Sequence, residues 1–246
     1  MIAAISGYLL SLATAAALFC WLRSLRKDDA YRKLCGKALR KGALCSFAVI
    51  AVSGALSVAL RLTGLREMEP LLYRALHTFV VLALAEEAVK FLTSRRVLRK
   101  TAYPYSRMDV ALVTTLVGVG FGVVENIAVA VGSNMIVMLI RAICIAHGGY
   151  GFLVGYFYGK GMKTGKNSDK VLGFVLTWLL HGLYDFSLSE EFIALNENLA
   201  IVAVALAALD VVLEVVMIVF FVKARKNELY TVPLRKAEAV PESAEI

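Results

Sequence analysis

Seven long apolar stretches, separated by short charged segments, are the feature of this sequence that most constrains its fold. A helix needs roughly 20 apolar residues to cross about 30 Å of hydrocarbon, and each stretch has that length or nearly so. The sequence therefore predicts an all-α, polytopic membrane protein with about seven transmembrane helices. The predicted spans are Ile2–Leu22, Gly42–Leu62, Leu71–Thr93, Asp109–Val131, Met135–Tyr158, Val171–Leu188 and Leu199–Val222.

The composition agrees with a membrane location and excludes several other classes of protein. Hydrophobic residues make up 59% of the 246 residues, and charged residues only 19%, below the roughly 25% usual for soluble domains. A soluble enzyme, a disordered chain and a disulfide-rich secreted domain are thereby disfavoured. The cysteines, Cys20, Cys35, Cys45 and Cys144, show no paired spacing, so neither a disulfide framework nor a cysteine zinc site is expected.

The distribution of positive charge predicts the orientation in the membrane. Most of the 27 Lys and Arg residues fall in four regions, 23–41, 95–107, 160–170 and 223–236. Because basic loops stay on the cytoplasmic side, we expect the amino terminus outside and the carboxyl terminus in the cytoplasm. Residues 1–222 then form the membrane domain, and 223–246 a flexible cytoplasmic tail. The net charge of +8 is explained by these segments, so the expected partner surface is the lipid bilayer and not nucleic acid.

Charged and polar residues inside the apolar stretches are the candidates for function. Such groups cost several kcal/mol at mid-membrane depth and must face one another or a water-filled cavity. Counting about 1.5 Å per residue from the cytoplasmic ends places groups from four helices in one slab, roughly 12–24 Å deep. Glu86, His147 and His181 are expected at roughly 12–18 Å, and Glu125 and Asp185 at roughly 21–24 Å. The same spans also hold Glu87, Lys90, Asn126 and Arg141.

Local spacing indicates which of these groups can interact. Lys90 follows Glu86 by four residues and Glu87 by three, so it can neutralise either carboxylate. The two glutamates differ by about 100° around the helix axis, so we expect one to act and the other to pair. Asp185 follows His181 by four residues and can orient its imidazole.

The remaining polar residues of the spans are assigned structural roles. We expect His77 to be an interhelical hydrogen-bond partner, Arg141 a counter-ion, Arg74 to extend outward, Asp109 to cap the fourth helix, and Asp210 and Glu214 to serve packing or pairing.

This set of residue types can hydrolyse an amide bond. A glutamate can activate water, and histidines, or a zinc ion that they hold, can stabilise the oxyanion. His147 and His181 are the best two zinc ligands, since a catalytic site normally has three protein ligands. The third could be Glu125, taken as the tentative choice, or Asp185, or one of the Glu86–Glu87 pair. A metal-free mechanism with glutamate as base and the histidines as oxyanion donors stays open.

A proton- or ion-coupled transporter is the alternative from another class, because transporters also place Glu, Asp and His inside the membrane. The sequence shows no inverted repeat and no pair of broken helices, which disfavours a transporter. A non-catalytic relative that only binds membrane partners is a further alternative.

The order of the motifs resembles the PrsW family of intramembrane proteases. That family is related to a wider group containing CAAX prenyl proteases and bacteriocin-processing relatives. The motifs are Ala-Glu86-Glu87-Ala-Val-Lys90, then Gly120-Phe121-Gly-Val-Val-Glu125-Asn126, then Arg141, His147-Gly-Gly and His181-Gly-Leu-Tyr-Asp185. They cover about four of the seven predicted spans. The CAAX branch tends to have histidine where this chain has Glu125, so the resemblance favours PrsW.

The resemblance implies a multi-pass endopeptidase of the bacterial cell membrane. Its substrate would be a single-span membrane protein of the anti-sigma-factor type, cut on the extracytoplasmic side. The active cavity is then expected within residues 71–188. Glu86 and Glu87 are implied as the essential pair, with His147 and His181 as catalytic or metal-binding groups. The supporting residues are Lys90, Glu125, Asn126 and Asp185.

Overall fold

The computed structural model describes residues 2–132, 135–143, 145–227 and 232–234. Within them the chain is helical and forms no β-strand, so the predicted all-α class is confirmed. The helices are α1 (Ile2–Ser24), α2 (Asp29–Arg61), α3 (Leu65–Met68), α4 (Pro70–Leu76), the π-helical segment η1 (His77–Leu84), α5 (Ala85–Arg99), α6 (Arg107–Gly132), α7 (Met135–Ile143), α8 (Ala146–Thr164), α9 (Asn167–Ser187), α10 (Glu190–Ile193), the 3₁₀ turn η2 (Glu197–Leu199) and α11 (Ala200–Lys226).

The chain is a multi-pass membrane protein. Among the described residues, four helices are long and apolar enough by themselves to cross a membrane, namely Ile5–Ser24, Asp29–Arg61, Arg107–Val131 and Ala200–Lys226. Their outward faces carry large apolar side chains that the described part of the chain leaves exposed, such as Ile50 and Ile201, which are 63% and 70% exposed. Lipid is the environment in which such faces are stable.

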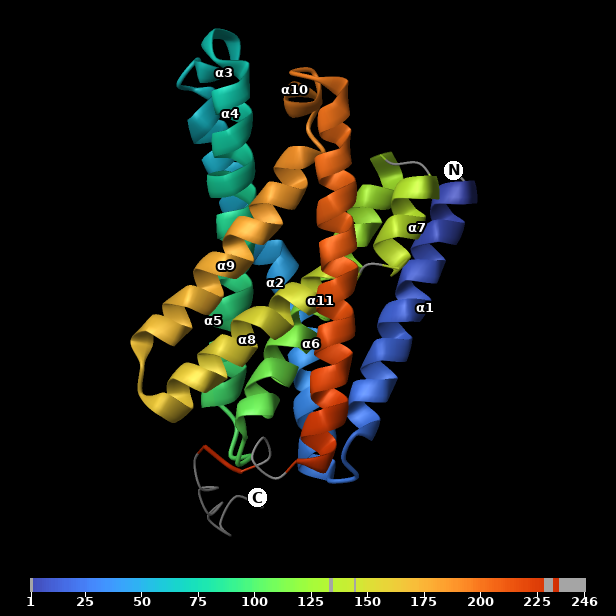
Figure 1. The fold of residues 1–246 in the computed structure, drawn as a ribbon, viewed down its shortest axis with the longest axis vertical. Helices are drawn as coiled ribbons and strands as arrows, with labels where there is room; N and C mark the ends of the chain where they lie inside the picture. Colours follow the sequence, from blue (N-terminus) through green and yellow to red (C-terminus); the bar gives the residue numbers. More distant parts are fainter. Residues whose placement is uncertain (1, 133–134, 144, 228–231, 235–246) are drawn as a thin grey trace, which may run out of the picture.

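The basic segments gather at one end of the bundle. The lower end of the view in Figure 1 holds the end of α1, the start of α2, the end of α5, the start of α6 and the end of α11. The turn from α8 to α9 points toward the same end. The short helices α3 and α10 lie at the opposite end, together with the amino terminus. This arrangement is the one that the positive-inside rule requires.

Helix α6 is the centre of the bundle. Val110, Leu112, Leu116 and Val117 on this helix are fully buried, and α6 packs against both α2 and α8. Glycines permit the close approach of the backbones. A Cβ atom at Gly118 would meet the backbone carbonyl of His147, and one at Gly120 would meet the backbone of α2.

Helix α2 begins well before the predicted second span. The expected basic loop is helical from Asp29, because the Asp28 carboxylate caps the helix by accepting hydrogen bonds from the Ala30 and Tyr31 amides at 3.0 and 3.2 Å. This extension, from Asp29 to Lys41, is amphipathic. It buries Tyr31, Leu34, Cys35 and Ala38 and leaves basic side chains on the other face.

The third predicted span is one helical rod with a wider segment in its middle. Segment η1 has π-helical hydrogen bonding. Such segments are rare in proteins, and those that occur are often found at functional sites. The indole Nε1 of Trp178 in α9 donates a hydrogen bond of 2.7 Å to the carbonyl of Phe79 in this segment. The same contact holds α9 in register with the rod just before α5 begins.

The prediction of a single helix for the fifth span, Met135–Tyr158, is wrong. The span is divided into α7 and α8, which meet near the middle of the bundle (Figure 1). Ile145 has non-helical dihedral angles, its backbone hydrogen-bonds the Glu214 carboxylate, and its carbonyl accepts from the Gly148 amide at 2.7 Å. Irregular backbone at this depth is stable because protein groups satisfy it. Cys144, at the junction, lies outside the described residues.

Two polar residues near the end of the bundle opposite the basic segments pair with side chains of other elements. The Nε2 atom of His77 lies 3.1 Å from the Ser57 hydroxyl of α2, as expected for an interhelical partner. Arg74 does not simply extend outward but makes a bidentate ion pair with Glu191 at 2.7 and 3.0 Å. This contact holds the pKa of Glu191 below its ordinary value.

The cap of α6 is Ser106 and not Asp109. The Ser106 hydroxyl accepts from the Asp109 amide at 3.2 Å, and the Ser106 amide donates to the Asp109 carboxylate at 2.8 Å. This reciprocal pair is a capping box, which the sequence analysis missed by one turn. Arg26 also contacts Asp109, at 3.3 Å.

The predicted tail, 223–246, is described only in part. Helix α11 continues to Lys226, beyond the expected end of the membrane domain at 222. The Leu234 amide donates to the Tyr105 carbonyl at 2.8 Å, beside the start of α6. Residues 228–231 and 235–246 lie outside the described residues, so the flexibility of the tail stays a prediction.

The orientation predicts the outcome of reporter fusions. Fusions after Lys27, Lys100, Lys166 and Lys226 should report a cytoplasmic location, because the basic segments remain inside. Fusions after Gly64 and Asn196 should report the opposite side. The reverse pattern at all six positions would overturn the orientation.

Candidate active site

The third rod supplies three charged side chains to the interior of the bundle. Glu86, Glu87 and Lys90 lie in the first two turns of α5, directly after the π-helical segment, and all three are buried. Lys90 approaches both carboxylates, as the sequence spacing predicts. Its Nζ atom lies 2.6 Å from Glu87 Oε1 and 3.7 Å from Glu86 Oε2.

The structure distinguishes the two glutamates. Glu87 pairs with Lys90 and also accepts from His181 Nδ1 at 2.8 Å. The Oε2 atom of Glu86, by contrast, is buried without a hydrogen-bond partner among the described residues. Because a buried polar atom without a partner is costly, Glu86 is the glutamate with an oxygen free for a ligand.

His147 lies in the first turn of α8, at the break in the fifth span. The absence of side chains at Gly118 and Gly122 of α6 makes room for it, since a Cβ at Gly122 would lie 3.1 Å from the His147 ring. Its Nε2 lies 2.6 Å from Glu125 Oε2, and its Nδ1 lies 3.1 Å from Lys90 Nζ. Both ring nitrogens are therefore engaged.

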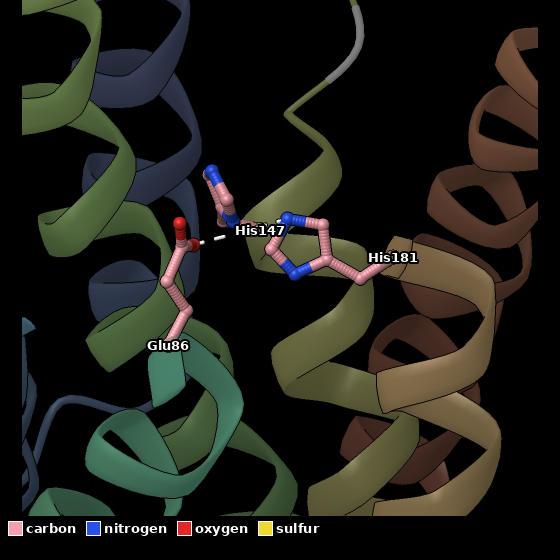
Figure 2. Close-up of side chains that lie close together, drawn as sticks. All are labelled: Glu86, His147 and His181. Carbon is pink, nitrogen blue, oxygen red and sulfur yellow. Dashed lines mark ion pairs between the residues drawn. The ribbon is translucent and has the colours of Figure 1, made fainter. Parts of the chain in front are cut away.

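His181 enters from α9 and faces the same point. Its Nε2 lies 3.3 Å from Asp185 Oδ2 and 3.8 Å from Glu86 Oε2. The rings of His147 and His181 meet edge to face, with their centroids 5.3 Å apart. Figure 2 shows Glu86 and both histidines pointing toward one another from α5, α8 and α9.

These three side chains form a candidate metal centre. One ligand atom each from Glu86, His147 and His181 can be chosen so that all lie within 4.8 Å of one another. The donor types suit zinc, and the unpartnered Glu86 oxygen is a free ligand. Each histidine also has a carboxylate on its other nitrogen, Glu125 for His147 and Glu87 for His181, as metal-binding histidines commonly do.

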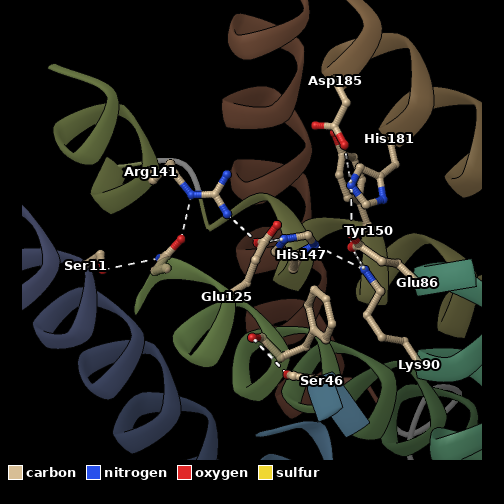
Figure 3. A network of polar contacts seen from close by, with 12 residues as sticks. Ser11, Ser46, Glu86, Lys90, Glu125, Arg141, His147, Tyr150, His181 and Asp185 are labelled. Atoms are coloured by element: carbon tan, nitrogen blue, oxygen red, sulfur yellow. Dashed lines mark hydrogen bonds and ion pairs between the residues drawn. The ribbon is translucent and has the colours of Figure 1, made fainter. Parts of the chain in front are cut away.

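Glu125, the tentative third ligand, lies at a different place in the site. Its carboxylate is held by His147 on one side and by the Arg141 guanidinium on the other. Arg141 Nε also donates to Asn126 Oδ1, and Asn126 donates to the Ser11 hydroxyl of α1 at 3.3 Å. Figure 3 shows this arm running from His147 toward α1. Arg141 is thus the counter-ion that the sequence analysis expected.

A small cavity joins the histidines to the Arg141 arm. It has about 40 Å³ of space for the centres of water molecules, which is room for more than one water. His147, His181, Asp185, Glu125 and Arg141 are among the residues that line it. The site therefore combines carboxylates and imidazoles with space for water, the groups that the hydrolysis of an amide requires.

Two residues of this site were missed by the sequence analysis. Tyr150 of α8 is fully buried and stacks on His181, with centroids 5.2 Å apart and an interplanar angle of 27°. Its hydroxyl donates to Asp210 of α11 at 3.0 Å. The sequence predicts only a packing or pairing role for Asp210. Asp210 does pair, with Tyr150, and through Tyr150 it is connected to His181 of the site.

Comparison with known proteins agrees with this geometry. The model of a family described as PrsW family intramembrane metalloprotease matches residues 32–222. The chain belongs to this family. The match includes every residue of the candidate metal centre but not α1.

Two curated relatives share part of the chain. It is 30% identical over 118 residues to Protease PrsW of Oceanobacillus iheyensis, an alignment that covers 46% of this chain and 54% of that protein. It is 29% identical over 129 residues to Protease PrsW of Clostridioides difficile, covering 47% and 52%. The chain thus spans about half the length of the curated relatives it matches. No solved structure matches it significantly.

The Tyr150–Asp210 contact predicts a stability effect. Tyr150→Phe should destabilise the protein by about 1–3 kcal/mol, because it leaves a buried carboxylate without its donor. Thermal unfolding of the purified protein in detergent measures this. Adding Asp210→Leu to Tyr150→Phe should restore most of the loss, since no polar group then remains unpaired. Unchanged stability of the single variant would contradict the contact.

Proposed function

We propose that this protein is an intramembrane metalloprotease that hydrolyses a peptide bond of a membrane-anchored protein. The observation that carries the proposal is the convergence of Glu86, His147 and His181 in a buried site of a chain that belongs to this family. The adjoining cavity gives water access to that site. A site buried among the helices of a membrane protein suits a substrate that is itself anchored in the membrane.

Glu86, His147 and His181 would hold the metal, and zinc is the ion that this donor set fits best. When bound, zinc polarises the scissile carbonyl and lowers the pKa of water. Glu87 and Glu125 orient the two imidazoles from their far nitrogens. Lys90 neutralises Glu87, and Arg141 neutralises Glu125, so the orienting carboxylates stay ionised inside the membrane.

Asp185 is the carboxylate left to accept a proton from water. It lines the cavity, is half-buried, and lies 3.3 Å from His181 Nε2. Glu87 is a poorer acceptor, because Lys90 and His181 already engage it. Without a metal, the free oxygen of Glu86 would take this role and the histidines would donate to the oxyanion.

The substrate is proposed to be a single-span protein of the anti-sigma-factor type, cut on the extracytoplasmic side. The resemblance to the PrsW family supports the substrate class. The cavity supports the side of cleavage, because it extends from the histidines to Arg141 in α7, which lies on the amino-terminal side of the break. The predicted orientation places that side outward.

Single substitutions predict which residues carry the reaction. Glu86→Gln, His147→Ala and His181→Ala should each lower cleavage of a single-span anti-sigma factor in proteoliposomes by at least about 100-fold. Each removes a proposed metal ligand, or, in the metal-free mechanism, the base or an oxyanion donor. His77→Ala is the matched control and should stay near wild type, since His77 lies away from the site, hydrogen-bonded to Ser57 and stacked on Tyr73. Near-normal activity of both site histidine variants, or proton flux in place of cleavage, would contradict the proposal.

Metal content provides a separate prediction. The purified protein should contain a single zinc ion per chain by elemental analysis, and chelation should abolish cleavage until zinc is restored. His181→Ala should lose the zinc, because it removes one of three ligands. Full activity of the metal-free protein would rule out the zinc centre and leave the glutamate–histidine mechanism.

A further inference from the structure

The Lys90 ammonium lies among the same side chains that would hold the metal. Besides Glu87 at 2.6 Å and Glu86 at 3.7 Å, it lies 3.1 Å from His147 Nδ1. It also lies 4.6 Å above the ring of Phe121, a favourable place for a cation. Figure 3 shows its tip between Glu86 and His147. Two of the three candidate ligands are therefore already in contact with a cation of the chain itself.

His147 cannot serve this cation and a metal through the same nitrogen. An imidazole nitrogen has one lone pair in the ring plane, and a zinc–nitrogen bond of about 2.0–2.1 Å uses it. At Nδ1 that lone pair faces Lys90, and Nε2 faces Glu125. One of these contacts must therefore break before His147 becomes a ligand.

The Glu125 contact is the one suited to stay. Arg141 holds the same carboxylate oxygen from the other side, and a carboxylate on the far nitrogen is the usual support of a metal-bound histidine. Lys90, in contrast, is a point charge on a flexible four-carbon stem. It can leave His147 while keeping its shorter contact with Glu87.

The geometry points to Lys90 as a built-in competitor of the metal: its ammonium fills the cation position of the metal-free site, and a divalent ion binds by displacing it from His147. This inference rests on the metal centre of the proposed function. It explains how two buried glutamates are tolerated inside the membrane before a metal arrives, since unpaired charges there are costly. Its consequence is a metal affinity lower than the ligand set alone would give.

Zinc titration of the purified full chain tests this inference. The protein is stripped with a chelator, returned to lipid nanodiscs and titrated with zinc against a chromophoric chelator. Lys90→Met should bind zinc about tenfold more tightly than wild type, or better, which is the effect of losing one charge-assisted hydrogen bond that opposes binding. Lys90→Gln is one atom shorter than lysine but keeps an N–H donor for Glu87. It should change the affinity in the same direction, and it keeps the test valid where Lys90→Met does not fold.

Two further variants separate this inference from its rivals. Arg141→Met also removes a nearby positive charge but contacts no ligand nitrogen, so it should raise the affinity by less than about threefold. An equal gain in Arg141→Met would mean a general charge effect and overturn displacement. His181→Ala should abolish binding in every background. Zinc binding that depends on His181 but is unchanged or weaker in both Lys90 variants overturns this inference alone, whereas no binding by any of the proteins overturns the metal centre as well.

Discussion

The ion pair between Lys90 and Glu87, inside the membrane-spanning part of the bundle, is the interaction on which the rest of the site depends. Two adjacent carboxylates would repel each other strongly in a medium of low dielectric constant. A single ammonium lies 2.6 Å from Glu87 and makes it a fixed anion, whereas it lies 3.7 Å from Glu86 Oε2 and makes no hydrogen bond to it. The fixed anion then orients His181, and the same ammonium contacts His147. One charge pair thus connects α5 to both α8 and α9.

Sequence reasoning located most of the helices because apolar runs of membrane length seldom occur outside transmembrane helices. It could not locate the division between α7 and α8, since the stretch from Met135 to Tyr158 is mostly apolar, has the length of a transmembrane helix and contains no proline. The break depends on partners distant in sequence. Gly118 of α6 leaves room for the His147 backbone, and Glu214 of α11 binds the backbone of Ile145. No local pattern carries that information.

The residues of the candidate site could be predicted from the sequence, because a charged group inside an apolar run costs free energy in the membrane and is found there mainly where it has a function. The partners of each group were not predictable. Spacing allowed Lys90 to neutralise either glutamate, and only the geometry gives Glu87 the close contact. Tyr150 was overlooked because a tyrosine in an apolar helix is ordinary, and its importance follows from the ring that it stacks on.

The π-helical segment ahead of the glutamates has a consequence for how this protein can vary in length. A π turn takes up one more residue than an α turn, because its hydrogen bonds run to the fifth residue and not the fourth. A residue lost or gained between His77 and Leu84 can be absorbed by a change between the two kinds of turn. The same change inside α5 would rotate Glu86 and Glu87 by about 100° around the axis. Related chains should therefore tolerate single insertions and deletions in the segment that corresponds to His77–Leu84, and should not tolerate them in the part of the sequence that corresponds to α5.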